Sequence, residues 1–244
     1  MRLALAYARA ETVQLVRYPG YWIPTIGFPA VVLVLLGQRL ERGEPERLLA
    51  GFAALSLVTI TFFQFGVGIA ANRTTPWETF LRTLPISIAT RLAGRVLSAL
   101  VFAAATVTIV AATATALFDA RLTIVRWALL VLALLLGSIP FALLGIGFGY
   151  WLSPRAALPV ANLLLLPLVI AGAFWARPAD DVPRLLDLAS QCLPARNWME
   201  ILDSIATGDS PLPLHHVAAL AGWGVVFFAF AWWAYRRDEG ERFR

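Results

Sequence analysis

The segment Thr75-Pro76-Trp77-Glu78-Thr79-Phe80-Leu81-Arg82-Thr83-Leu84-Pro85 is a polar-flanked helix signal between two long apolar runs. Thr75 and Glu78 have the spacing of a capping box, in which the two side chains satisfy free backbone N–H groups at a helix start. Pro76 fits the first helical position and Pro85 ends the helix. One apolar stripe at positions i, i+3, i+4 and i+7 consists of Trp77, Phe80, Leu81 and Leu84. Glu78 and Arg82 form an i, i+4 pair on the polar side. The stretch predicts a short amphipathic helix, which either lies on a membrane surface or docks onto a soluble partner.

The composition is that of a membrane protein. Of the 244 residues, 59% are hydrophobic and 14% are charged, and the mean hydropathy is +0.73. These values favour a polytopic, all-α chain whose apolar helices cross a bilayer. All 20 basic residues are arginine. A P-loop needs a lysine for the β- and γ-phosphates, so the chain has no ATP site of this type. The net charge of +5 is better explained by loop asymmetry than by nucleic-acid binding.

Six apolar runs are long enough to cross a bilayer, at about 20–38, 48–71, 91–118, 126–151, 156–176 and 215–235. They make residues 1–244 a single transmembrane domain. Residues 1–19 precede them as an interfacial helix that ends at Pro19 and Gly20. Two short helices are expected between 182 and 207, and they either lie on the membrane surface or dip into the bilayer against the bundle. The second has Trp198, Ile201, Leu202 and Ile205 on one face.

Arginine distribution predicts the orientation. With the N-terminus inside, twelve of the twenty arginines lie in inner segments, and outer loops hold ten of the fifteen acidic residues. Arginine excess marks the cytoplasmic side, so both termini and the segment 75–85 are expected in the cytoplasm, as in a multi-pass protein of the plasma (inner) membrane. Arg91 and Arg95 lie at the cytoplasmic start of the third span, where their side chains can snorkel towards the membrane surface.

Polar chemistry is sparse inside the predicted spans. Gln64 and Asn162 are the notable polar residues, and an interhelical hydrogen bond is favoured over a role as substrate ligand for each. Gly145 and Gly149 form a small-xxx-small pair that permits close helix contact. His215 and His216 are adjacent and do not share a helix face, so they are interpreted as interfacial residues and not as metal ligands. We expect no catalytic residues and no metal site, which disfavours an intramembrane enzyme.

Two segments resemble the membrane-spanning permease subunits of ABC-2 type transporters. The stretch Asn72-Arg73-Thr74-Thr75-Pro76-Trp77-Glu78-Thr79-Phe80-Leu81-Arg82-Thr83-Leu84-Pro85-Ile86-Ser87 is similar to the family pattern E-R-x-x-G-T-x-E-x-L-x-x-T-P-x-S, with Asn72 replacing the acidic residue and the glycine unmatched. Ala171-Gly172-Ala173-Phe174 through Asp181-Val182-Pro183, followed by Leu193-Pro194-Ala195-Arg196-Asn197-Trp198, is similar to the outer pattern S-G-x-x-x-P … L-P … P-x-x-Y. The resemblance covers nearly the whole chain.

The resemblance implies the partners. Such permeases form a dimer of identical or related subunits and dock two cytoplasmic ATPase subunits, which carry ATP and Mg²⁺; this chain would hold no cofactor itself. The helix after the second span acts as a coupling helix in the family. By this resemblance Thr75, Trp77, Glu78, Phe80, Leu81, Arg82 and Leu84 form the docking face and its rim.

The substrate follows less directly. Uncharged, aromatic-rich spans favour export of a hydrophobic or amphipathic molecule, either drug-like or a lipid, and a glycan is the alternative within the family. Outside transport, a structural or assembly membrane protein remains the competing hypothesis. It predicts no ATPase partner, and its helix at 75–85 would rest on the bilayer.

Overall fold

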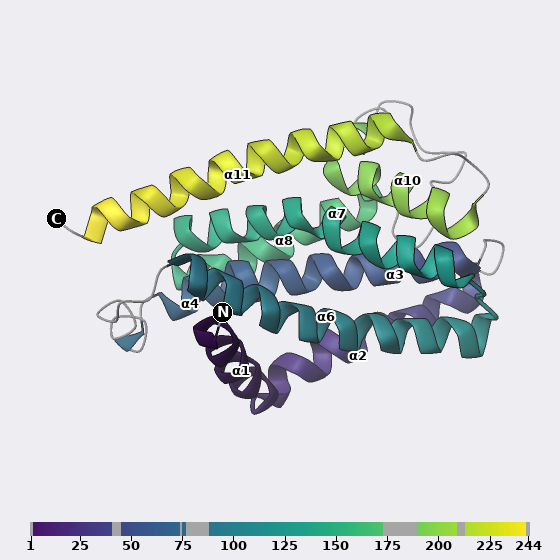
Figure 1. The fold of residues 1–244 in the computed structure, drawn as a ribbon, viewed down its shortest axis with the longest axis horizontal. Coiled ribbons are helices and arrows are strands. Elements are labelled where there is room, and N and C mark those ends of the chain that lie inside the picture. Colours follow the sequence, from purple (N-terminus) through teal and green to yellow (C-terminus); the bar gives the residue numbers. More distant parts are fainter. Residues whose placement is uncertain are drawn as a thin grey trace.

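The computed structural model describes residues 2–40, 45–73, 75–76, 88–172, 190–208 and 213–242, and every regular element in these ranges is a helix (Figure 1). The all-α fold class is therefore confirmed. In chain order the helices are α1 (Arg2–Val16), α2 (Pro19–Leu40), α3 (Pro45–Ile60), η1 (Thr61–Val67), α4 (Gly68–Asn72), α6 (Ile88–Phe118), α7 (Ile124–Trp151), α8 (Pro154–Gly172), α10 (Pro194–Thr207) and α11 (Leu214–Arg242).

Four of these helices are long and apolar enough to cross a bilayer. They are Pro45–Asn72, in which α3, η1 and α4 run on continuously, and then Thr90–Phe118, Ile124–Trp151 and Leu214–Gly240. They correspond to the second, third, fourth and sixth predicted spans. The layout of all six spans stays a prediction, because the remaining two positions differ.

The first predicted span is half of a bent pair. Leu3–Val16 and Pro19–Leu35 together meet the length and apolarity of a span, but they meet at an angle of 85°. The bend lies where Pro19 and Gly20 were expected to break the chain, and α2 then continues through Pro24 and Pro29. The fifth predicted span contains the shorter apolar helix Pro154–Ile170, and the last positions predicted for it, 173–176, lie outside the described residues.

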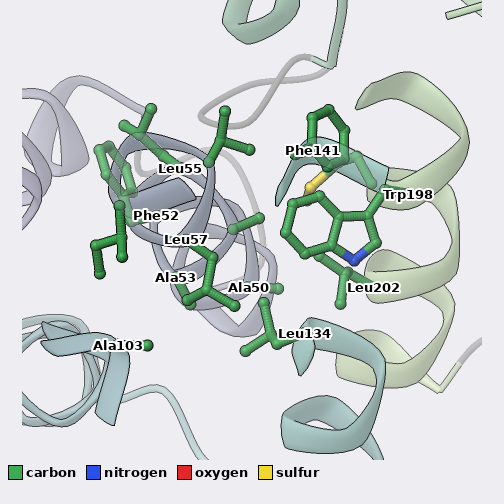
Figure 2. Close-up of a cluster of buried hydrophobic side chains, with 14 of the residues drawn as sticks. Ala50, Phe52, Ala53, Leu55, Leu57, Ala103, Leu134, Phe141, Trp198 and Leu202 are labelled. Atoms are coloured by element: carbon green, nitrogen blue, oxygen red, sulfur yellow. The ribbon is translucent and has the colours of Figure 1, made fainter. Parts of the chain in front are cut away.

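Helix α3 is the core of the bundle. Most of its side chains are buried, and α2, α6, α7, α8 and α10 all pack against it. Figure 2 shows how Phe52 and Leu57 of α3 share the interior with Leu134 of α7 and Trp198 of α10. The Trp198 ring lies 5.2 Å from that of Phe141, and its Nε1 donates to the Ala133 carbonyl at 3.0 Å. Burial of this aromatic group, with its polar atom satisfied, fixes α10 onto α7.

The middle of the α3–α4 span widens into a π-helix, η1, against which α7 packs closely. Gly145 and Gly149 lie on the α7 face that makes this contact. A Cβ atom at Gly145 would lie 2.7 Å from the Thr61 carbonyl oxygen, and one at Gly149 would lie 2.8 Å from the Phe65 and Gly66 carbonyl oxygens. Only glycine therefore lets the two backbones approach this far.

Polar contacts gather at the two ends of the bundle. The α4 end holds α4, the α7–α8 turn and the C-terminal part of α11, and α1 packs beside α6 near this end (Figure 1). The α10 end holds α10 and the starts of α3, α7 and α11.

Candidate functional site

The predicted docking segment leaves the bundle at the α4 end. Thr75 is described, and its Oγ1 donates to the Asn72 carbonyl at 2.7 Å as the chain turns out of α4. Trp77, Glu78, Phe80, Leu81, Arg82 and Leu84 lie outside the described residues, so the docking face stays a prediction. The structure does describe the end of α4, from which that segment starts.

Arg73 fixes the end of α4 to two other helices. Its Nη1 donates to the Tyr150 carbonyl and, at 2.7 Å, to Oδ1 of Asp238; its Nη2 donates to the Leu152 carbonyl at 2.6 Å. The side chains of Arg73 and Asp238 are only 13% and 9% exposed. The guanidinium neutralises the carboxylate of α11 and caps the C-terminus of α7, where a positive charge is favourable. Two residues before Thr75, one side chain thus joins α4, α7 and α11.

A second buried ion pair connects α1 to the same end. Nε of Arg95 lies 2.9 Å from Oε1 of Glu11, and the two side chains are 8% and 11% exposed. In the structure Arg95 is buried and does not extend to the protein surface, because α1 covers this part of α6 and supplies the counter-charge. Sequence pattern alone missed this pair, since its partners are 84 residues apart.

Gln64 lies in η1 and faces neighbouring helices. Its Nε2 donates to Oγ of Ser98 at 3.2 Å, and its Oε1 is 3.5 Å from the Tyr21 hydroxyl. Ser98 Oγ also accepts from the Thr12 hydroxyl at 3.0 Å. Gln64 is therefore part of a buried hydrogen-bonded group that connects α1, α2, η1 and α6.

Asn162 behaves differently. Its side chain is exposed on α8, and it makes no hydrogen bond with the part of the chain that the structure describes. An interhelical hydrogen bond within one chain, the role that the sequence favoured, is thus not seen among these residues. Exposed threonine hydroxyls on other helices differ from this amide, because they donate to a carbonyl of their own helix: Thr108, for example, donates to the carbonyl of Ala104, one turn back.

The α10 end is held by side chains from three helices. Asp203 of α10 forms an ion pair with Arg47 of α3, both about 10% exposed. Arg126 of α7 donates to the carbonyl of Thr207 at 3.1 Å. His216 of α11 meets Oδ1 of Asn197 through its Nδ1 at 2.7 Å. Helix α10 thus packs against the bundle, while its place at the membrane surface or within the bilayer stays a prediction.

The tautomer of His216 follows from the geometry of Asn197. The amide nitrogen of Asn197 donates to the carbonyls of Gln191 and Leu193, at 3.0 and 2.8 Å. Its oxygen is therefore the atom that faces the imidazole, and Nδ1 of His216 must donate. The histidine positions α10 against α11, a structural role that the sequence did not reveal. The other helix predicted in this loop, which begins at 182, lies outside the described residues.

Comparison with known proteins agrees with this architecture. Residues 43–233 match the family model described as ABC-2 family transporter protein. In Bacillus subtilis (strain 168) the protein named "Putative transport permease YvfS" is 21% identical over 199 residues, which are 82% of this chain and 80% of that protein. The family model covers well over half of the chain and includes the helices from α3 to most of α11. The chain therefore belongs to the ABC-2 transporter family, as a membrane-spanning permease.

Proposed function

We propose that this permease works with two cytoplasmic ABC ATPase subunits and a second permease subunit as an ATP-driven exporter in the plasma (inner) membrane. ATP and Mg²⁺ would be held by the ATPase subunits. Trp77, Phe80, Leu81 and Leu84 would form the docking face, with Glu78 and Arg82 at its rim and Thr75 as its cap. The observation that carries the proposal is the position of Arg73, two residues before this segment.

Arg73 gives a docked ATPase a mechanical connection to the bundle. A push on segment 75–85 reaches α4 through the backbone, and Arg73 is bonded to the end of α7 and to Asp238 of α11. Three helices would thus move together when the ATPase subunits close. Rigid movement of a packed unit between two arrangements is the usual basis of such switching.

Both termini are proposed to lie in the cytoplasm. At the α4 end, α1 is joined to the start of α6 by the Glu11–Arg95 pair, and Asp238, close to the C-terminus, is joined to Arg73. Both terminal helices thus share one end of the bundle with the start of segment 75–85, as Figure 1 shows. This grouping supports the orientation expected from the arginine distribution.

A hydrophobic or amphipathic substrate is proposed from the character of the exposed surfaces. The outward faces of the described spans carry large apolar side chains, for example Leu132 on α7, Leu163 on α8 and Phe228 on α11. A drug-like molecule or a lipid can move along such surfaces without desolvating a charge.

The test is a pair of substitutions in the docking face. The permease is co-expressed with its neighbouring genes, among which a P-loop ATPase is expected, and the tagged permease is purified in mild detergent. Replacement of both Trp77 and Leu81 by Asp places two charges on the docking face. The ATPase should then be lost from the purified complex, and transport by reconstituted vesicles should stop.

A Val13→Asp, Val16→Asp double variant is the matched control, because it introduces the same two charges at side chains that are 41% and 53% exposed on α1. It should leave the ATPase bound. Normal recovery of the ATPase and normal transport by the Trp77→Asp, Leu81→Asp variant would contradict the assignment of the docking face to these residues. A wild-type permease that purifies alone, with no ATP hydrolysis, would overturn the proposed function as a whole.

A further inference from the structure

An apolar cavity of about 410 Å³ lies between α7, α10 and α11, towards the α10 end. Its wall is made of leucine, isoleucine, valine, alanine, glycine and proline side chains, with Trp198 at the base. The one polar atom of the tryptophan ring already donates to the Ala133 carbonyl. A water molecule needs two to four polar partners, and this wall offers none that is free, so the cavity is unsuited to water.

The cavity is continuous with the outer surface of the bundle. Leu132, Leu136 and Ile139 belong to its wall, and they are 52%, 57% and 49% exposed. Both α7 and α11 are helices of spanning length, so these side chains face hydrocarbon in a membrane. The surface that continues into the cavity is thus already a lipid-contacting surface.

The length of the cavity along α7 matches the thickness of the hydrocarbon in one bilayer leaflet. Its wall on α7 extends from Leu129 to Pro140, which at 1.5 Å per residue is about 16 Å along the helix. It begins near the start of α7 at Ile124. The hydrocarbon core of a bilayer is about 30 Å thick, so one leaflet contributes about 15 Å. The cavity therefore has the length of a single acyl chain lying parallel to the helices.

We propose that this cavity is a binding site for one acyl chain of a bilayer phospholipid, and that this acyl chain fills the space between α7, α10 and α11. An empty space of this size would leave its wall without dispersion contacts on one side. A saturated or unsaturated hydrocarbon tail restores those contacts and needs no hydrogen-bonding group. The inference rests on the membrane setting of the family and not on the export substrate proposed above.

Two glycines on α11 provide a matched test. Gly224 belongs to the cavity wall, and a Cβ atom there would meet only Pro140 Cγ, at an ordinary 3.7 Å. Gly222, two residues earlier, has nothing within 4 Å of such an atom and is not part of the wall. Gly224→Leu thus puts a side chain into the cavity, whereas Gly222→Leu puts the same side chain outside it.

The full-length permease is reconstituted into phosphatidylcholine vesicles in which one acyl chain carries a diazirine, and the photoadducts are mapped by peptide mass spectrometry. Wild type and Gly222→Leu should show adducts on the cavity wall, at Leu136 and Leu220, in excess of those at Leu163 on the exposed face of α8. Gly224→Leu should lose this excess. Ala221→Phe, which fills the same space from another position, should lose it too and covers the case in which Gly224→Leu does not fold.

Equal labelling of the wall in all folded variants, or no excess over Leu163 in the wild type, would overturn the proposal. A second copy of the permease is the competing occupant. It would be recognised by an intermolecular disulfide in a Leu132→Cys, Cys192→Ser double variant together with an unlabelled wall. Neither outcome depends on ATP hydrolysis, so loss of the proposed transport function leaves this test valid.

Discussion

At the residue scale, the Arg47–Asp203 pair shows how a buried charge fixes an element. Both side chains are about 10% exposed, and removal of one member of such a pair leaves the other charge poorly solvated. Asp203→Asn should therefore lower the free energy of unfolding by about 3 kcal/mol, measured by thermal unfolding of the purified permease. Asp119→Asn is the control, since Asp119 in its pair with Arg121 is 74% exposed; it should change stability by less than about 0.5 kcal/mol. Joint replacement by Arg47→Met and Asp203→Leu should recover most of the loss, and equal destabilisation by both Asn variants would contradict this account.

At the element scale, the contact between α7 and η1 depends on the absence of side chains. Gly145→Ala would place a Cβ atom 2.7 Å from the Thr61 carbonyl oxygen, which belongs to backbone and cannot rotate away. Overpacking of this kind costs about 1–3 kcal/mol, so the unfolding temperature should fall. Gly222→Ala, on an open face of α11, should leave it unchanged or raise it slightly, because alanine is the better helix former. Equal unfolding temperatures of the two variants would show that α7 and η1 can separate without cost.

At the scale of the whole molecule, we predict that the proposed second permease subunit binds at the face of α8 that carries Asn162. Its exposed amide lies on α8 beside the exposed Leu158, Leu163 and Leu166, and an amide facing hydrocarbon without a partner is costly. In a twofold-symmetric dimer with this face at its interface, Asn162 would meet its own copy, and two asparagines can form a pair of hydrogen bonds. An Asn162→Cys, Cys192→Ser variant should therefore give a disulfide-linked dimer on oxidation, detected by non-reducing electrophoresis. Val225→Cys in the same background is the control, because Val225 is 70% exposed on α11, and cross-linking there in preference to Asn162→Cys would move the interface away from α8.

Long apolar runs allowed the helices, but not their pairing, to be predicted. The run predicted at 126–151 is α7, Ile124–Trp151. A helix that crosses the bilayer needs about 20 apolar residues, and an apolar run of that length can be recognised from the sequence alone. The face of α10 that carries Trp198 and Leu202 is buried, since an amphipathic period requires an apolar partner. Pro19 and Gly20 predicted where the chain bends between α1 and α2, but the 85° angle of the bend and the π-helix were not predicted from any local pattern.

The ion pairs were the least predictable part of the candidate site. Arg73 and Asp238 are 165 residues apart, and each alone is typical of a charged residue at the edge of a span. The arginine distribution predicted a side of the membrane for Arg73 but no partner. The docking face of segment 75–85 depends on residues outside those described, so it stays a prediction from sequence and family resemblance.

The distance in sequence between Arg47 and Asp203 also has a consequence for biogenesis. The two residues are 156 positions apart, and a ribosome adding 5–20 residues each second needs on the order of ten seconds to cover that interval. During this time α3 has been made but its counter-charge has not. In this interval Arg47 lacks this counter-charge while α6, α7, α8 and the first part of α10 are synthesised. The ion pair therefore forms late in membrane insertion. In chains arrested before residue 203, α3 carries Arg47 without its packing partner α10, and we expect such chains to be recognised by the quality-control proteases of the membrane.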